Sequence, residues 1–274
     1  MYTIIKKQKI ADNTYLMDIE APQIAKKAKA GQFIILRIDE KGERVPLTIA
    51  DFGGKTVTIV FLVAGKTTEQ LSQLRKCDKL LDVVGPLGNS SRIEEFGVVW
   101  LIGGGLGIAP LYPIAKALKK KKNYVVVVIG AKSKSSLFWE DKLKSVSHRL
   151  VVCTDDGSKG KKGFVTTALK ELIETEERPN RAIVIGPPIM MQAVTKMTKD
   201  RIKTIASLNP IMVDGIGMCG CCRVSVEEVV KFACCDGPEF DAHKVDWDEL
   251  LNRNRSFVKD EEACKEQSCK KEKE

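Results

Sequence analysis

Five of the nine cysteines lie close together, at positions 219, 221, 222, 234 and 235. Thiolates bind iron and zinc, and a cysteine cluster in a chain without a secretory signal is typical of a metal site rather than of disulfides. Asp214, Cys219, Cys222 and Cys234 repeat the C-x4-C-x2-C…C spacing of plant-type ferredoxins, with aspartate in the first position. Glycines between them leave the loop free to wrap a [2Fe–2S] centre. The spacing therefore predicts a two-iron cluster.

Two other interpretations of these cysteines remain open. A zinc site could use four of the five thiols, whereas five inert buried cysteines would be unusual at this density. Cys221 and Cys235 adjoin two of the expected cluster ligands, so either could take its neighbour's place.

A second chemical signal is the glycine-rich segment that follows the apolar run Val98–Ile102. The residues expected to approach a phosphate there are Gly103, Gly104, Gly105, Leu106 and Gly107. Pro110 suits the first turn of a helix, and the N-terminus of that helix supplies amide donors to an anion. The pattern is not the G-x-G-x-x-G fingerprint, because Pro110 stands where the third glycine would be. A tight turn without a ligand is the alternative.

Small and acidic residues follow the later apolar runs as well. Asp155, Asp156 and Gly157 come after one such run, and Gly186 comes after another. In an open α/β sheet, ligands collect at the carboxyl ends of the strands. We therefore expect these four residues to help bind a dinucleotide.

Two segments of the N-terminal third carry residue types that a flavin needs. The first combines a cation, a rigid proline and a hydroxyl, in Arg44, Pro46, Leu47 and Thr48. The cation can neutralise a pyrophosphate, and the hydroxyl of Thr48, the candidate catalytic group, can hydrogen bond near the reactive edge of the ring. The second is a phosphate seat at an expected helix start, made of Val63, Gly65, Thr67 and Thr68. Alternatively, one of these threonines only caps the helix.

The apolar periodicity divides the chain into three parts and a tail. Residues 1–95 carry short β-type runs, which predict a small closed antiparallel barrel with one helix at Thr67–Arg75. Residues 96–208 alternate strands with helices, which predicts βαβ units and a parallel sheet. The helices expected there are Pro110–Lys121, Ser136–Ser145, Thr166–Glu174 and Ile189–Thr198. Residues 209–258 form a small cluster-binding segment, and residues 259–274 form a charged, disordered tail.

Composition narrows the class of protein. The 274 residues carry a formal charge of +9, with 43% hydrophobic and 30% charged residues, as in ordinary globular chains. The apolar runs are far too short to span a bilayer, and the N-terminus has no signal-peptide core. Lysines are scattered and aromatic residues make up only 6%, which argues against a nucleic-acid-binding surface. We expect a cytoplasmic protein with no membrane or nucleic-acid partner.

The order of these parts resembles the ferredoxin reductase-like electron-transfer subunits, which include the iron–sulfur subunit of dihydroorotate dehydrogenase. One branch of that family is most similar, namely the small (alpha) subunits of NADH-dependent ferredoxin–NADP oxidoreductases, also called sulfide dehydrogenase beta subunits. The segments that carry the resemblance are RVPLTIAD, GGGLGIAP, VDGIGMCGCC and FACCDGPEFDAHKVDWDELLNR. The resemblance covers about residues 1–258 and is most specific in the last two segments.

The resemblance implies FAD in the barrel, NAD(H) on the α/β part and one [2Fe–2S] cluster. The cluster ligands that it implies are Asp214, Cys219, Cys222 and Cys234. Arg44 lies four residues before Thr48, whereas the wider family has its arginine three residues before the hydroxyl. The resemblance also favours NADH over NADPH, although Lys132 or Lys134 could meet a 2′-phosphate.

An oligomer and a reaction follow from the same resemblance. It implies a heterodimer with a larger flavin and iron–sulfur subunit related to the glutamate synthase small subunit, and ferredoxin as a partner of that complex. The expected function is oxidation of NADH at FAD, with electrons passing through the cluster to the larger subunit of an electron-bifurcating oxidoreductase. The alternative is the electron-transfer subunit of an NAD-dependent dihydroorotate dehydrogenase, against which aspartate at position 214 argues.

Outside these motifs the sequence is less specific. No residue stands out as a general base, and His148 and His243 lie outside every motif. Trp247, Leu250 and Leu251 have helical spacing beyond the cysteine loop. We expect them to contact a partner, or else to pack back onto their own domain.

Overall fold

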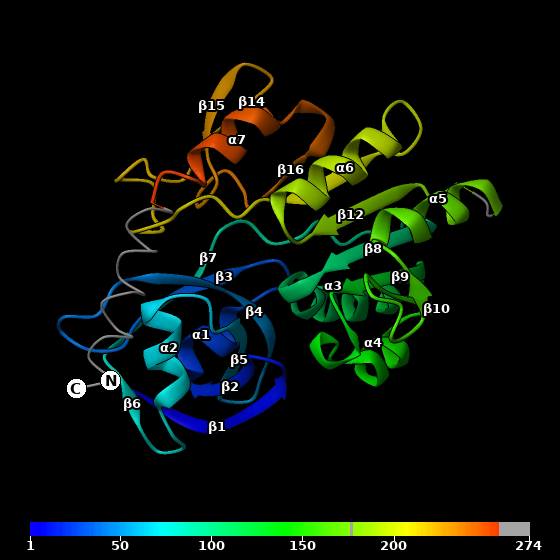
Figure 1. Cartoon of the computed structure of the whole chain (residues 1–274). Helices are drawn as coiled ribbons and strands as arrows, with labels where there is room; N and C mark the ends of the chain where they lie inside the picture. Colours follow the sequence, from blue (N-terminus) through cyan, green and yellow to red (C-terminus); the bar gives the residue numbers. More distant parts are fainter. Residues whose placement is uncertain (176–177, 258–274) are drawn as a thin grey trace.

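The computed structural model describes residues 1–175 and 178–257. The tail expected at residues 259–274 therefore lies outside the described residues. An N-terminal barrel, a central α/β sheet and a C-terminal segment pack together, and the C-terminal segment lies beside both other parts (Figure 1). In the described part of the chain, no helix is long and apolar enough to cross a membrane.

The N-terminal part is a seven-stranded antiparallel sheet with the strand order β6-β1-β2-β5-β4-β3-β7. Its strands are β1 (Tyr2–Ala11), β2 (Thr14–Glu20), β3 (Phe33–Arg37), β4 (Val45–Gly53), β5 (Thr56–Leu62), β6 (Lys79–Leu80) and β7 (Asp82–Leu87). The two edge strands, β6 and β7, follow each other directly in the chain, so the sheet curls into a nearly closed barrel. Alternate residues of β5 fill its interior, and Val57, Ile59 and Phe61 are fully buried. Two helices, α1 (Pro22–Lys27) and α2 (Lys66–Gln73), complete this part.

The central part is a seven-stranded sheet with the order β11-β10-β9-β8-β12-β13-β16. Its parallel strands are β8 (Val98–Gly104), β9 (Tyr124–Ala131), β10 (Arg149–Thr154), β11 (Lys161–Lys162), β12 (Arg181–Ile185) and β13 (Thr204–Ser207). β8, β9 and β12 consist of nearly continuous apolar residues, as expected for strands that are covered on both faces. The expected alternation of strands and helices is confirmed.

Helices cover both faces of this sheet (Figure 1). They are α3 (Ile108–Lys120), α4 (Glu140–Val146), α5 (Val165–Thr175) and α6 (Pro188–Thr198). Val99 and Leu101 of β8 point toward α3 and α4, and the core on that face includes Ala50 and Val60 of the barrel. Trp100 and Ile102 point to the opposite face, toward α5 and α6. The first helix pair is therefore the layer that joins the sheet to the barrel.

One helix start was predicted wrongly. The sequence pattern placed a helix at Ser136–Ser145, but α4 begins at Glu140, and Ser136 ends a short 3-10 turn, η2 (Lys134–Ser136). The chain cannot continue as a helix between them because Trp139 has a φ of 60°. The other predicted helices of the central part agree with α3, α5 and α6 to within a few residues.

A further short 3-10 turn of the central part, η1 (Gly105–Gly107), lies between β8 and α3.

The C-terminal segment is more regular than its sequence pattern indicates. The elements of the C-terminal segment are β14 (Arg223–Val226), β15 (Val229–Phe232), β16 (Glu239–Asp241), the 3-10 turn η3 (Ala242–Lys244) and α7 (Trp247–Arg253). β14 and β15 form a hairpin, whereas β16 adds an antiparallel edge strand to the central sheet by pairing with β13. This segment thus shares a sheet with the central part, and the domain boundary at residue 208 stays a prediction.

Trp247 and Leu250 do not face a partner, so that expectation is wrong for them. Trp247 is 8% exposed and Leu250 1% exposed, and both belong to the core that also holds α6. The indole N–H of Trp247 donates to the carbonyl oxygen of Ala242 at 3.0 Å. The apolar side of α7 packs back onto its own chain because β14 and α6 offer it a surface to cover, and only Leu251 stays half-buried.

Candidate functional site

A cavity of about 840 Å³ lies where the three parts of the chain meet. Thr48 lines it from the barrel, Gly105 and Gly186 from the central sheet, and Met212 and Pro238 from the C-terminal segment. Its lining is mostly apolar with a few polar groups, which is the usual character of a cofactor pocket. The carboxyl ends of the parallel strands open into it, as the position of their glycines predicts.

The barrel contributes one wall through β4. Pro46, Leu47 and Thr48 all line the cavity, and Thr48 pairs with Phe33 of the neighbouring strand β3. All three residues are half-buried, so their side chains are held by the sheet yet reachable from the cavity. Leu62 at the end of β5 adds apolar surface to the same wall. This part of the predicted flavin motif is therefore brought to the central cavity.

The glycine-rich loop forms the facing wall. Gly104, Gly105, Leu106 and Gly107 line the cavity, and Gly103 lies just behind them under the side chain of Leu111. Gly105 has a φ of 55°, and a Cβ at that position would meet nothing within 4 Å, so its backbone faces open space. The first amides of a helix have no acceptor within the helix, and here the residues of the helix start line the cavity. The residues present fit a dinucleotide phosphate.

Of the two acidic residues predicted to lie at this site, Asp155 and Asp156, only Asp155 lines the cavity. Lys132 also belongs to the lining. Asp156 instead accepts hydrogen bonds from the hydroxyl and the backbone amide of Ser158, at 2.6 and 2.9 Å. These bonds, that of the hydroxyl first, hold the pKa of the Asp156 carboxyl below its ordinary value. Gly157 follows in the same turn and lies outside the cavity lining.

Of the predicted phosphate seat of the barrel, Thr67 lines a separate cavity of about 500 Å³, whereas Gly65 and Thr68 do not. Lys66 lines the same cavity, as do the acidic residues Asp39, Glu40 and Glu43. The hydroxyl of Thr67 donates to Glu43 at 2.6 Å. The hydroxyl of Thr68 accepts from the amides of Ala64 and Gly65, at 2.9 and 3.1 Å, and so closes the loop before α2. The N-cap of α2 is Gly65, so the expectation that a threonine occupies that position is wrong; Thr68 instead lies in the first turn and accepts from the N-cap amide. The first amides of α2 are left for a phosphate.

Two further residues of the flavin prediction stand apart from both cavities. Val63 is half-buried and donates its amide to the carbonyl oxygen of Asn13 at 2.8 Å. Arg44 is exposed at the start of β4, and its role toward a pyrophosphate stays a prediction.

The cysteine loop is organised around Asp214. Its two carboxylate oxygens accept hydrogen bonds from the amides of Ile216, Met218 and Cys219, at 3.0, 3.1 and 2.6 Å. These amides hold the pKa of the carboxyl below its ordinary value, with Ile216 as the largest cause. Asp214 therefore shapes the loop backbone, and its role as a cluster ligand stays a prediction.

The thiols of the loop lie at two depths. Cys222 and Cys234 are buried with their sulfurs 3.2 Å apart, and the sulfur of Cys235 is 3.7 Å from that of Cys234. Burial raises the pKa of the Cys234 thiol above its ordinary range. The thiol of Cys219 is exposed, and hydrogen bonding to the backbone of Asp214 lowers its pKa. Iron–sulfur clusters are held by several thiolates that lie close together, and backbone hydrogen bonds to the sulfurs tune them. The thiols of this loop and the backbone hydrogen bonds to Cys219 therefore fit an iron–sulfur cluster.

A single-metal arrangement is not seen in residues 1–175 and 178–257. There, no three His, Cys, Asp or Glu side chains converge as the ligands of one metal ion would. Cys221 and Cys235 both lie beside the expected ligands, as their positions in the sequence predict.

The cysteine loop lies against the barrel close to the large cavity. A Cβ at Gly215 would be 2.6 Å from Cδ1 of Ile35 on β3 and 2.9 Å from Cδ1 of Leu87 on β7. Only glycine allows this approach. Met212, two residues before Asp214, lines the cavity itself. The loop thus contacts the barrel strands β3 and β7 and follows a residue of the cavity wall directly in the chain.

Sequence reasoning missed several lining residues. Phe164 and Ile189 line the cavity although they are 64% and 63% exposed, and Met190 lies beside them. Each follows the carboxyl end of a strand, and that position was the signal that could have identified them. His148 and His243 lie outside the cavity and are exposed, as expected of residues without a chemical role.

Two stretches of the chain match known protein families. Residues 209–246 match the iron–sulfur cluster binding domain of dihydroorotate dehydrogenase B, and residues 101–196 match the oxidoreductase NAD-binding domain. The first match supports an iron–sulfur cluster at the cysteine loop and not the zinc interpretation. The second agrees with a dinucleotide at the glycine loop.

Similar proteins align over nearly the whole chain. The dihydroorotate dehydrogenase B (NAD(+)), electron transfer subunit homolog of Thermotoga maritima is 48% identical, over 97% of this chain and 95% of its own length. The dihydroorotate dehydrogenase B (NAD(+)), electron transfer subunit of Bacillus pumilus is 32% identical, over 89% of this chain and 96% of its own length.

Solved structures extend these similarities. A chain from the NADH-dependent reduced ferredoxin–NADP oxidoreductase, solved in connection with flavin-based electron bifurcation, has a TM-score of 0.92 at 47% identity and covers 98% of both chains. Phthalate dioxygenase reductase has a TM-score of 0.63 over 82% of this chain and 85% of that chain. At 15% identity, the second similarity shows the fold alone.

Proposed function

Because this chain belongs to the family of dihydroorotate dehydrogenase B electron-transfer subunits and their homologues, we propose that it oxidises NADH and passes the electrons to a larger flavin and iron–sulfur subunit. The observation that carries the proposal is the shared cavity. Thr48 of the barrel, Gly105 of the NAD-binding sheet and Met212 of the cysteine segment all line it. A donor bound to the sheet and an acceptor bound to the barrel would meet there, close to the cysteine loop.

The residues of this chain bind and orient the reacting groups. When bound, FAD supplies a ring that accepts hydride from NADH, and a [2Fe–2S] cluster supplies a one-electron acceptor. The amides of Gly105–Gly107 bind the dinucleotide phosphates, and Thr48 offers its hydroxyl to the edge of the flavin ring. Leu47 and Leu62 keep water out of the contact, because both present apolar surface to the cavity.

The further site residues have supporting roles in this proposal. Asp155 faces the ribose of the dinucleotide from the cavity rim, and the α2 N-terminus with Thr68 receives the flavin phosphates. Asp214, Cys219, Cys222 and Cys234 hold the cluster. The larger partner resembles the glutamate synthase small subunit, and the complex exchanges electrons with ferredoxin in the cytoplasm.

The ferredoxin-linked branch is supported over the dihydroorotate branch by similarity. Identity is 47% to the oxidoreductase that is named for NADH and ferredoxin and 48% to the homolog from Thermotoga maritima, but only 32% to 34% to the relatives that are named as dihydroorotate dehydrogenase subunits outright. The dihydroorotate branch is the second candidate, since it supplies the matching cluster-binding family.

The experiment starts with the chain purified without oxygen. It should contain FAD and about two irons, and NADH should bleach the flavin absorbance much faster than NADPH does. With the larger subunit added, electrons should pass between NADH and ferredoxin, and not between NADH and orotate. A preparation that contains neither flavin nor iron would refute the proposal, and transfer to orotate alone would favour the second candidate.

A further inference from the structure

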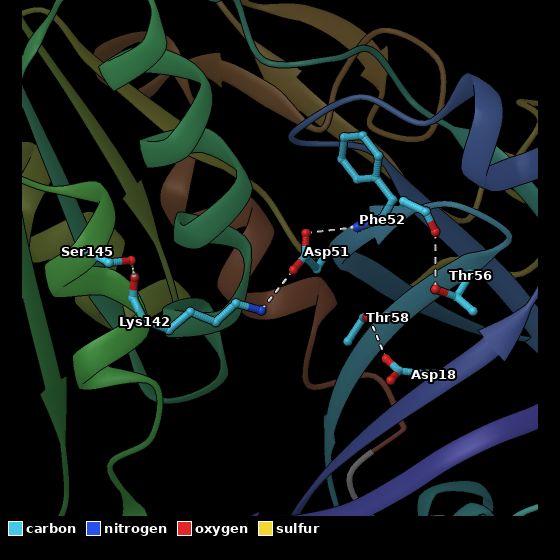
Figure 2. Close-up of polar contacts among 8 residues, drawn as sticks. Asp18, Asp51, Phe52, Thr56, Thr58, Lys142 and Ser145 are labelled. Carbon is cyan, nitrogen blue, oxygen red and sulfur yellow. Dashed lines mark hydrogen bonds and ion pairs between the residues drawn. The ribbon is translucent and has the colours of Figure 1, made fainter.

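Lys142 connects two parts of the molecule. It lies on α4, a helix of the central part, and its Nζ is 2.9 Å from Oδ2 of Asp51 on β4 of the barrel (Figure 2). The side chains are 30% and 27% exposed, so solvent reaches the pair only in part. The other oxygen of Asp51 accepts from the amide of Phe52 at 3.0 Å, which fixes the direction of the carboxylate.

Two aromatic rings bracket the same ammonium group. Nζ of Lys142 lies 4.0 Å from the ring centroids of both Tyr112 and Trp139. The two rings meet edge to face at 5.9 Å. A cation over an aromatic face is attracted by the quadrupole of the ring. Trp139 adopts its φ of 60°, which is costly for a bulky residue, while it makes this contact.

The clasp, by which we mean Lys142 with Asp51, Tyr112 and Trp139, joins the two walls of the large cavity. Asp51 follows Thr48 by three residues on the strand that lines the barrel side. Tyr112 lies on α3, which begins directly after the glycine loop on the opposite side. The clasp therefore links the flavin-type strand to the helix that carries the phosphate-binding amides.

The interface around the clasp is mostly apolar, and a backbone hydrogen bond from the amide of Asp12 to the carbonyl oxygen of Ser135, at 3.0 Å, also joins the barrel to the central part. Around the clasp, buried Ala50 of β4 packs against Ile108 and Leu111 of α3. Apolar contacts resist separation but have no preferred direction, whereas a charge between fixed partners sets the register of two surfaces. The clasp is thus the charged contact that orients β4 relative to α3 and α4.

We propose that Lys142 is a positioning residue, whose clasp sets the distance and angle between the glycine loop and the flavin-binding strand, and hence the approach of the nicotinamide to the flavin. The proposal rests on the proposed function. The clasp itself is a property of the chain and can be measured without cofactors.

The test compares Lys142→Met, Asp51→Asn, the double variant and Lys142→Arg in the cofactor-loaded chain. A misplacement of about 1 Å can slow a reaction about 100-fold, so we expect Lys142→Met to slow flavin reduction at saturating NADH by about tenfold. The dissociation constant of NADH should change less than about twofold, because the phosphate-binding amides stay in place. Arginine keeps the charge and the stacking, so Lys142→Arg should recover most of the rate. The double variant should be no slower than Lys142→Met, since both changes break one clasp.

A matched control lies within the barrel. Asp82 pairs with Arg37 at 2.7 Å, with side-chain exposures of 41% and 26%, but this pair does not cross between parts. Asp82→Asn should leave the reduction rate unchanged. Flavin reduction by Lys142→Met at the rate of Asp82→Asn would overturn the proposal, as would a loss that appears only in NADH affinity.

A second measurement keeps this inference separate from the proposed function. In the cofactor-free chain, amide hydrogen exchange in β4 and α4 should be faster in Lys142→Met than in Asp82→Asn, by about threefold or more. If wild-type chain takes up no flavin or is not reduced by NADH, the proposed function fails while the exchange result still stands. Equal exchange in both variants would overturn the clasp itself.

Discussion

Replacing Gly107 with alanine should destabilise the chain far more than the same change at Gly105. A Cβ at Gly107 would lie 2.0 Å from the carbonyl oxygen of Ile185 and 2.5 Å from its carbonyl carbon. These are backbone atoms of the last residue of β12 in the central sheet, so no side-chain rotation relieves the clash. Overpacking of a core costs about 1–3 kcal/mol, and a clash with fixed backbone belongs at the upper end, about 3 kcal/mol.

Gly105 is a matched comparison in the same loop. Its φ of 55° makes alanine costly by about 1 kcal/mol, but a Cβ there would meet nothing within 4 Å. Gly105 lines the large cavity, and in the proposed function the methyl group would occupy space that the dinucleotide phosphate needs. Gly105→Ala should therefore weaken NADH binding with a small loss of stability, whereas Gly107→Ala should lose stability first.

Urea unfolding followed by tryptophan fluorescence measures the difference. About 2 kcal/mol between the variants corresponds to a shift of about 0.7 M in the midpoint, at a slope of about 3 kcal/mol per molar urea. Isothermal titration with NADH measures the binding effect. Equal midpoints for the two variants would refute the packing argument, and unchanged NADH affinity in Gly105→Ala would refute the placement of the phosphate.

Four further outcomes are expected. Leu250→Ala should cost about 2–5 kcal/mol in urea unfolding, while Val229→Ala at a 54% exposed position should change stability by less than about 0.5 kcal/mol; equal effects would contradict the packing of α7. Thr68→Ala should lower the flavin content per chain, measured by absorbance, because two amides before α2 lose their acceptor. Asp214→Cys should keep about two irons and change the EPR g-values, since cluster ligation tunes the centre; a wild-type spectrum would argue against aspartate as ligand. Burial raises the pKa of Glu239, so the folded chain binds its proton more tightly than the unfolded chain and loses stability as pH rises through that raised pKa. Glu239→Gln should lessen this loss when unfolding is compared at the ordinary carboxyl pKa and at neutral pH.

Local patterns in the sequence determined the elements and the chemistry that they carry. Alternating residues such as Val57, Ile59 and Phe61 predict a barrel strand, and the continuous apolar run at Val98–Ile102 predicts a strand covered on both faces. The cysteine spacing and the glycine loop indicate a cluster and a phosphate because ligand sets of this kind come from residues close in the chain.

Only the tertiary structure decided which residues meet, because such contacts join residues that are far apart in the chain. Thr48, Gly105 and Met212 share a cavity. Trp247 is buried rather than partner-facing because the chain folds β14 and α6 beneath it. Lys142 reaches the barrel only because α4 packs against α3, which itself packs on β4, and no spacing in the sequence connects Lys142 with Asp51.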